Sequence, residues 1–468
     1  MRLNACLDIY YMNELLTDDM LERRFIPRFW KQFVAIAILV WLNACKSLGP
    51  NTLFRSSSPH EQYERSLKDA KLDQTALGAD WVAAADRAMR DSVRISVPHR
   101  ESGYFSASKP FAVGYRLNSK RGDRFYIQVD IQGMKDAQVF IDVFDLSGRE
   151  PDRIVSAKAD TNRLVWETRR SGAHLIRIQP ELLRGGSYTI SITREPVLSF
   201  PVKDRDSRSI SSYFGAPRDG GRRTHEGVDI FAPRGTPLLA SVDGIISGVG
   251  VNRLGGNVVW LSDVKRNLRL YYAHLDKQLV REGQQVSVGD TIGTVGNTGN
   301  ARNTAPHLHF GVYQFSEGAV DPLPFVRLGS GPARQPLLSE SRLGDSVRVS
   351  VTRAVVRQSP KPDAPVLQEL PRSFAFTVLG GTAEWLRVEL PGELTGYVSS
   401  TVIEPVDKPI RRLPIAGPTN LLEAATSQAA IVETLPGGMA VDVLGVVEDF
   451  QLVRSPNGQT GWVLRATQ

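Results

Sequence analysis

The chain of 468 residues has only two cysteines, Cys6 and Cys45, so a disulfide-bonded scaffold and a four-cysteine zinc site are both excluded. Its N-terminal apolar run, residues 33–42, is ten residues long, which is short for a membrane-spanning helix. No run of basic residues occurs, and the net charge of +7 is spread along the chain. We therefore expect no nucleic-acid partner.

Composition and length indicate several folded, β-rich domains. Hydrophobic residues make up 41% and charged residues 23%, which is close to average globular usage and argues against wholesale disorder. The length allows about three or four domains. The 40 glycines and 28 prolines fit short strands joined by turns better than helical bundles. The predicted fold class is mostly β and multidomain.

The N-terminus has the features of an export signal. Basic residues precede the apolar run 33–42, which fits a signal-peptide core. Residues 42–45 resemble a bacterial lipobox, in which Cys45 becomes the lipidated first residue of the mature protein; Asn43 departs from that pattern. We expect residues 1–45 to be a signal peptide and the protein to be a membrane-anchored lipoprotein of the cell envelope, in the periplasm. The alternative is an uncleaved N-terminal anchor.

The periodicity of apolar residues changes along the rest of the chain. A helical stretch is predicted over about residues 60–89, packing against the next domain. Alternating patterns at 125–131 and 188–192 predict an antiparallel β-sandwich. The predicted divisions are a tether and helical segment (46–92), a β-sandwich (93–200), a second β-rich domain (201–327), a linker (328–343) and two small modules (344–405 and 410–468).

The last two modules form an internal repeat. Each has a Leu-Pro turn, a Val-Leu-Gly step and a Gly-aromatic-Val ending, as in 396–398 and 461–463. They resemble bacterial SH3-like modules, small β-barrels that hold secreted hydrolases on cell-wall polymers. Their other interpretation is a packing spacer without a ligand.

Four of the seven histidines lie in the domain 201–327. His225 and Asp229 are predicted to share one face of a strand, with the intervening Val228 facing the core. His307 and His309 are predicted to share a face in the same way. Two imidazoles and one carboxylate suffice to bind zinc, with the fourth position left to water.

A further histidine, His274, follows Tyr272-Ala273 between these two pairs. Either pair alone is a weak signal, because such spacings arise by chance. Both pairs in one short β domain, in this order and with His274 between them, make coincidence a poor explanation. The combination predicts a metal site that has additional histidines beside it.

These residues resemble the lysostaphin or LytM-type zinc metallopeptidases, which cut peptidoglycan cross-links. The resemblance covers residues 202–326 and includes Gly296-Asn297-Thr298-Gly299 and His307-Leu308-His309-Phe310. It implies one Zn²⁺ per chain, bound by His225, Asp229 and His309. It also implies that His274 and His307 are unligated catalytic residues, which orient the attacking water and help to protonate the leaving amine.

The resemblance implies a zinc metalloendopeptidase that hydrolyses peptide cross-links or stem peptides of peptidoglycan during cell-wall remodelling. Many regulatory relatives have lost part of the metal set, so its intactness here favours an enzyme. Two alternatives from other classes are a catalytically silent scaffold that activates a separate murein amidase and a wall-binding adhesion protein. Peptidoglycan is the expected partner; divisome or amidase partners cannot be named from the sequence.

Overall fold

The computed structural model describes residues 56–133, 138–315, 317–336, 343–390 and 394–465. Within these ranges the protein is mostly β, as the sequence predicts. The predicted signal peptide and Cys45 lie outside them. None of the helices in the described part of the chain is both long and apolar enough to cross a membrane.

Two helices occupy the stretch for which the sequence predicts one. Helix α3 (Pro59–Asp69) begins at a capping box, in which Ser58 and Glu61 each accept a hydrogen bond from the other's backbone N–H. It ends before Lys71, whose φ of 57° is incompatible with a continuing helix. A 3-10 turn, η1 (Leu72–Gln74), leads to α4 (Ala76–Arg90), where Thr75 is the N-cap.

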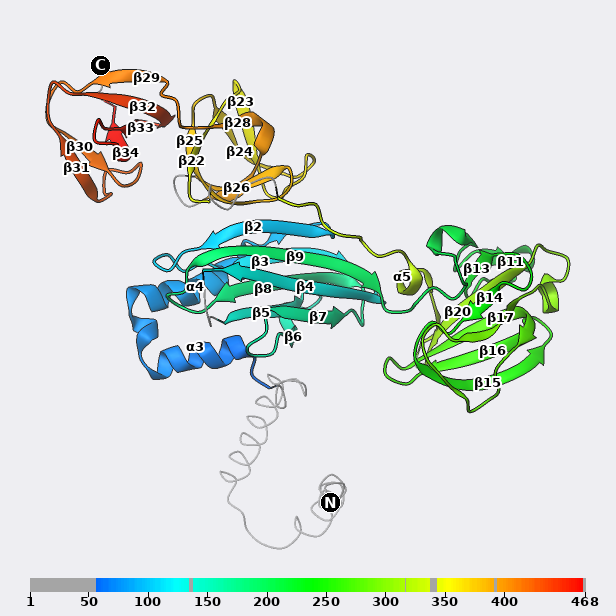
Figure 1. Cartoon of the computed structure of the whole chain (residues 1–468). Helices are drawn as coiled ribbons and strands as arrows, with labels where there is room; N and C mark the ends of the chain where they lie inside the picture. The colour runs from blue at the N-terminus through cyan, green and yellow to red at the C-terminus, as the bar shows by residue number, and fades with distance from the viewer. Residues whose placement is uncertain (1–55, 134–137, 316, 337–342, 391–393, 466–468) are drawn as a thin grey trace, which may run out of the picture. The chain divides into compact units, whose positions relative to one another are not determined.

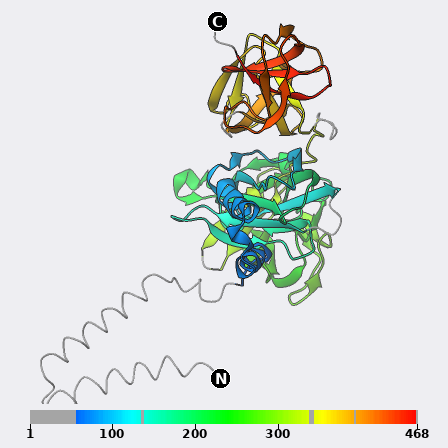
Figure 2. The same ribbon diagram turned by 90° about the vertical axis from the view of Figure 1, so that its left-hand side faces the viewer.

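Both helices contact one sheet of the β-sandwich, α3 through β5 and α4 through β3 and β8 (Figures 1 and 2). Trp81 of α4 is buried and donates a hydrogen bond from Nε1 to the carbonyl of Pro180, at 2.9 Å. Its ring and Leu67 of α3 pack with Phe140 of β5. The apolar helix positions therefore pack against the sandwich.

The sandwich consists of two antiparallel layers whose inward-facing side chains form one core. One layer has the order β1 (Val93–Arg94), β3 (Val113–Ser119), β8 (Gly172–Pro180), β5 (Val139–Asp145) and β6 (Asp152–Ser156), with β1 parallel to β3. The other has the order β2 (His99–Phe105), β9 (Gly186–Pro196), β4 (Asp123–Gln132) and β7 (Arg163–Glu167).

A second β-rich region follows the sandwich and has its own core. Its main sheet has the order β10 (Ile210–Ser212), β13 (Val228–Phe231), β20 (His307–Gln314), β17 (Leu268–Gln278), β16 (Gly256–Asp263), β15 (Gly244–Asn252) and β18 (Gln285–Val286). Strand β14 (Pro237–Leu239) pairs with β19 (Thr291–Val295), which also pairs with β17, and β21 (Gly318–Val320) pairs with β20. A short hairpin, β11 (Pro217–Arg218) and β12 (Arg223–Thr224), and the helix α5 (Leu323–Val326) complete the region.

The two C-terminal repeats are separate sets of short strands. The first contains β22 (Ser346–Val349), β23 (Arg353–Arg357), β24 (Val366–Pro371), β25 (Ala375–Gly381), β26 (Trp385–Glu389), β27 (Thr395–Ser399) and β28 (Ile403–Pro405). The second contains β29 (Arg411–Pro414), β30 (Thr419–Leu422), β31 (Ile431–Leu435), β32 (Ala440–Val447), β33 (Phe450–Arg454) and β34 (Thr460–Leu464). Ala375 of the first packs with Leu444 and Leu452 of the second.

The first repeat continues a sheet of the sandwich, an arrangement that no sequence pattern indicates. Strand β25 pairs antiparallel with β2 through Ser102↔Gly381 and Gly103↔Gly380. The sequence predicts a separate module, joined to the rest of the chain by the linker 328–343. Backbone hydrogen bonds instead join the module to the sandwich.

A buried ion pair accompanies this strand pairing. Glu101 on β2 is 0% exposed, and its Oε1 lies 3.0 Å from Nη1 of Arg387 on β26, which is also buried. Arg387 donates a further hydrogen bond to the hydroxyl of Tyr188, and Tyr397 donates one to Glu101 at 2.7 Å. Burial alone would raise the pKa of Glu101, but Arg387, His99 and Tyr397 lower it to about 2.

Candidate active site

The pairing of β13 with β20 brings the two sequence motifs together. Asp229 on β13 stands opposite His309 on β20. On β20 the side chains of Leu308 and Phe310 enter the core and are 0% exposed, while His307 and His309 line a cleft on the other face. The predicted alternation along residues 307–310 is therefore present in the structure.

The local conformation predicted for His225 is wrong. Strand β13 begins at Val228, so His225 lies in the segment before it rather than on the strand. Its Nε2 still reaches Oδ1 of Asp229, at 3.0 Å. Gly227 leaves room for the ring of His309, because a Cβ at this position would lie 2.7 Å from Cε1 of His309.

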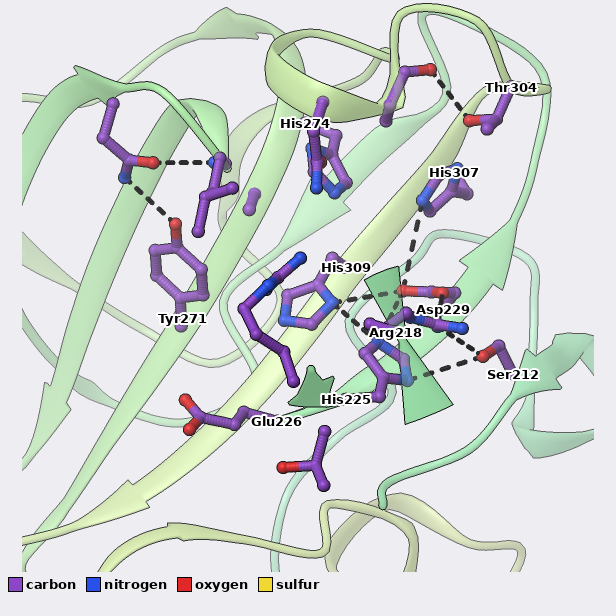
Figure 3. Close-up of a pocket in the computed structure, with 18 of the residues that line it drawn as sticks. Ser212, Arg218, His225, Glu226, Asp229, Tyr271, His274, Thr304, His307 and His309 are labelled. Atoms are coloured by element: carbon purple, nitrogen blue, oxygen red, sulfur yellow. Dashed lines mark hydrogen bonds and ion pairs between the residues drawn. The ribbon is translucent and has the colours of Figure 1, made fainter. Parts of the chain in front are cut away.

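Three donor atoms converge on the floor of the cleft: Nε2 of His225, Oδ1 of Asp229 and Nδ1 of His309, all within 4.8 Å of one another (Figure 3). The Nδ1 of His225 lies 2.9 Å from the carbonyl oxygen of Tyr213, which can only accept, so Nδ1 holds the proton. The lone pair of Nε2 is then directed at the other two donor atoms.

His274 reaches the cleft through a β-bulge in β17. Tyr272 and Leu275 both enter the core, whereas Ala273 and His274 both line the cleft, so the strand holds one residue more than regular alternation allows. His274 has φ of 65°, a conformation that non-glycine residues adopt rarely and that occurs often at functional sites. Its Nδ1 donates to the carbonyl of Thr298 at 2.9 Å.

His307 is held in a similar way. Its Nδ1 donates to the carbonyl of Ala305 at 2.9 Å, and its Nε2 lies 4.0 Å from Oδ1 of Asp229.

Burial, together with the nearby His307 and His309, lowers the pKa of His274 to about 4. His274 is therefore neutral at pH 7, with a free Nε2 lone pair that can accept a proton.

Asp229 is a buried carboxylate that stays ionised. Burial alone would raise its pKa, but the close contacts of Oδ1 with His225 and His309 hold the pKa well below its usual range. Its other oxygen, Oδ2, accepts a hydrogen bond from Arg218 at 2.8 Å. Burial lowers the pKa of His309, which leaves this imidazole neutral and able to act as a ligand.

The cleft around these groups has a volume of about 1130 Å³. One wall carries the aromatic side chains of Trp260, Tyr271 and Tyr313, and another carries three arginines on and beside the β11–β12 hairpin: Arg218, Arg222 and Arg223. Sequence reasoning did not single out Arg218. The only available signal, its place in an Arg- and Gly-rich stretch before His225, does not distinguish it from its two neighbours.

The donor set fits zinc. Two imidazole nitrogens and one carboxylate oxygen, open to a cleft, match the three-ligand pattern of catalytic zinc sites. The residues that would hold the ion are His225, Asp229 and His309. His274 and His307 lie beside them, with ring centroids 5.0 Å apart, and their Nδ1 atoms are engaged by backbone carbonyls.

Comparison with known proteins places this site within a recognised domain. Residues 223–322 match Peptidase family M23, and residues 352–404 and 417–467 each match the bacterial SH3 domain. The M23 match begins just before His225 and ends after β21. It therefore includes all five histidine and aspartate side chains of the site.

Curated relatives match the peptidase region. The L-Ala--D-Glu endopeptidase of Bacillus subtilis is 38% identical over 140 residues, which are 28% of this chain and 43% of that protein. The peptidoglycan DD-endopeptidase ShyC of Vibrio cholerae is 40% identical over 132 residues, 27% of this chain and 29% of that protein. The chain thus spans less than half the length of either relative.

Among solved structures, the catalytic domain of lysostaphin from Staphylococcus simulans is 39% identical; the match covers 25% of this chain and 89% of that domain, with a TM-score of 0.23. The family-model matches, the curated relatives and the site geometry together identify residues 223–322 as a domain of peptidase family M23, of the LytM and lysostaphin type, in a chain that also carries two bacterial SH3 domains.

Proposed function

We propose that the protein is a zinc endopeptidase that hydrolyses peptide bonds in peptidoglycan. The observation that carries the proposal is the convergence of Nε2 of His225, Oδ1 of Asp229 and Nδ1 of His309 on the floor of an open cleft. The relatives named above, an L-Ala--D-Glu endopeptidase and a DD-endopeptidase, support peptidoglycan as the substrate. Peptide bonds in stem or cross-link peptides, with D-alanine to diaminopimelate first, are the proposed targets.

Zinc bound by the three ligands supplies a Lewis acid that polarises the scissile carbonyl and makes water more acidic. The remaining chemistry belongs to His274 and His307. Each imidazole is fixed through Nδ1 by a backbone carbonyl, which directs its Nε2 into the cleft. A neutral Nε2 accepts a proton from the attacking water and returns one to the leaving amine, so no covalent intermediate is needed.

Digestion of purified sacculi by the protein tests this proposal. We expect new free amines without new reducing sugars, together with loss of activity after exhaustive chelation and recovery after addition of zinc. Activity that survives chelation would rule out the metal mechanism. The absence of any soluble product would favour a silent scaffold that activates an amidase, or an adhesion protein.

We further propose that the protein acts in the cell envelope and is attached to the membrane, through a lipid on Cys45 or through an uncleaved N-terminal anchor. The relatives' action on peptidoglycan supports the envelope, and the lipobox-like residues 42–45 support the lipid. Palmitate labelling of wild type and of Cys45→Ser distinguishes the two attachments. Labelling that persists in Cys45→Ser refutes lipidation at this residue.

We propose that the two SH3 domains either bind the cell wall or pack against the rest of the enzyme without binding a ligand. Tyr397, an aromatic residue that the repeat singled out, is 0% exposed and donates to Glu101, so it is unavailable to a ligand. Trp385 and Trp462 are half-buried. This favours the packing role for the first domain. We therefore expect Trp385→Ala to pellet with sacculi to the same extent as wild type.

A further inference from the structure

The two oxygens of Asp229 have different partners. Oδ1 lies 3.0 Å from Nε2 of His225 and 3.1 Å from Nδ1 of His309. Oδ2 accepts a hydrogen bond from Nη2 of Arg218 at 2.8 Å, and the same nitrogen donates to Oγ of Ser212 at 2.6 Å (Figure 3). One oxygen therefore faces the other metal-ligand atoms, and the second is held by an arginine.

We infer that Arg218 is a positioning residue, which engages Oδ2 of Asp229 and thereby leaves Oδ1 as the single oxygen offered to a metal. This inference rests on the proposed function for the metal, but not on the substrate. A charge-assisted hydrogen bond fixes the carboxylate plane, because turning Oδ2 toward the ligand atoms would break that bond. Such outer partners of ligating side chains orient the ligand and tune the metal.

The surrounding backbone ties Arg218 to the ligand segment. Arg218 stands in register with Arg223 in the β11–β12 hairpin. The N–H of His225 donates to the carbonyl of Ala216 at 2.8 Å, and the N–H of Gly215 donates to the carbonyl of His225 at 2.8 Å. Two backbone hydrogen bonds thus join His225 to the residues directly before β11, and the pairing of β11 with β12 fixes the backbone position of Arg218.

Two effects of Arg218 on metal affinity oppose each other. Its positive charge beside Asp229 repels a cation, while its hydrogen bond preorganises the ligand oxygen. Loss of an outer partner typically weakens metal binding by about 10- to 100-fold. We therefore expect orientation to outweigh repulsion here.

The test is the zinc affinity of the full chain, measured by competition with a chelator in the absence of any substrate. Arg218→Met should weaken zinc binding by about 10- to 100-fold, and Arg218→Lys, which keeps the charge but not the planar fork, should fall between this variant and wild type. The matched control is Arg222→Met. Arg222 lines the same cleft and donates to the carbonyl of Asp219, but not to a ligand, so its loss should leave zinc affinity unchanged.

A second measurement reports the coordination itself. In the cobalt-substituted protein, release of Oδ2 lets Asp229 bind through both oxygens, and the higher coordination number weakens the visible absorption. Arg218→Met should therefore lower this absorption at full cobalt occupancy, and Arg222→Met should not. A side chain that only supports the fold would change neither the spectrum nor, once melting temperatures are matched, the affinity.

Zinc affinity and cobalt absorption in Arg218→Met that equal those of wild type would overturn the inference. If Arg218→Met fails to fold, Ser212→Ala removes the second acceptor of Arg218, together with a 3.4 Å contact between Oγ of Ser212 and Nδ1 of His225, and should weaken zinc binding in the same direction by a smaller factor. Wild-type protein that binds zinc but cuts no sacculi would contradict the proposed peptidase function and leave the role of Arg218 standing.

Discussion

Two buried carboxylates, Glu101 and Asp229, show how the same physical problem is solved in two ways. Both are nearly inaccessible, at 0% and 9% exposure, and both have a pKa below the usual range. Glu101 is paired with the full charge of Arg387 and accepts a hydrogen bond from Tyr397. Oδ1 of Asp229 faces the imidazoles of His225 and His309, and Oδ2 accepts a hydrogen bond from Arg218.

The difference separates a structural site from a chemical one. The charge of Glu101 is balanced by Arg387, a residue of the same chain, and both side chains are buried. Around Asp229 three candidate ligand atoms converge at the floor of an open cleft, an arrangement that a divalent cation stabilises. The first cluster should therefore control stability, and the second should control metal binding and turnover.

The largest effect is expected from the ligands. Asp229→Ala and His309→Ala should lose stoichiometric zinc, and the rate on sacculi should fall by ~10³-fold or more, since a catalytic metal contributes several kcal/mol to transition-state stabilisation. Metal analysis and amine release measure the two losses. Glu101→Gln is the matched control, and its zinc content should equal that of wild type; a loss of zinc there would contradict the separation of the two clusters.

Next in size is the effect of the two unligated histidines. His274→Ala and His307→Ala should keep near-stoichiometric zinc and lose about 10²- to 10⁴-fold in turnover, the usual contribution of general acid–base groups. The measurement is metal content beside steady-state rates on a soluble cross-linked muropeptide. If His274→Ala released zinc as readily as His309→Ala, the division between ligands and bases would be wrong.

Breaking the Glu101 cluster should affect stability and leave chemistry intact. Arg387→Met strands a buried carboxylate, and such changes cost about 3–5 kcal/mol in the free energy of unfolding. The double variant Glu101→Leu with Arg387→Met should recover part of this loss, because no unpaired charge remains. Lys109→Ala removes an exposed ion pair with Glu389 and should cost less than about 1 kcal/mol. Denaturant unfolding measures all three.

The two clusters should also differ in the pH range over which they change stability. In the metal-free protein His274 has a pKa of about 4 against 6.5 when unfolded, so the unfolded chain binds more protons between these values and stability falls as pH drops from 6.5 to 4. Glu101 has a pKa of about 2 against 4.5, so its contribution is complete above pH 4.5 and is lost as pH falls toward 2.

Substitutions assign each pH range to its residue. His274→Gln should reduce the slope of the unfolding free energy between pH 6.5 and 4 and leave the lower range unchanged. Glu101→Gln should do the reverse. Part of the slope between pH 6.5 and 4 should remain in His274→Gln, because burial also lowers the pKa of His60 to about 4 and lowers the pKa of His174 and His309. Thermal melts of metal-free protein from pH 7 to 3 give the comparison, and a slope between pH 6.5 and 4 that persists undiminished in His274→Gln would count against the low pKa of this histidine.

Local patterns allowed much of the fold to be predicted, and long-range contacts set the limit. The mostly β class follows from alternation over a few residues, as in Phe125–Ile131, which lies within β4. The placement of His307 and His309 on one strand face follows from the same period. Neither pattern reveals that His225 precedes its strand, or that His274 lies on a bulge with positive φ, because both conformations depend on strands that pair from elsewhere in the chain.

The interactions missed by sequence reasoning share one property. Glu101 and Arg387 are 286 positions apart, and their pairing depends on the register of β2 with β25. Arg218 is eleven residues from Asp229, but only the turn of the β11–β12 hairpin brings it to Oδ2. No short spacing marks such pairs in a single sequence, whereas metal-ligand histidines repeat a recognisable one.

The pairing of β2 with β25 has a consequence for the order in which the chain folds. The residues of the sandwich are synthesised before residues 375–381. Strand β2 therefore stays an open sheet edge until the first SH3 domain has been synthesised and pairs with it. An unpaired sheet edge is a template for association with other chains. This edge strand carries the carboxylate of Glu101, which is buried in the folded chain. The negative charge of Glu101 disfavours pairing of β2 with strands of other chains. Arg387 of the first SH3 domain neutralises this charge when the native strand pairs, so the ion pair favours the correct partner strand.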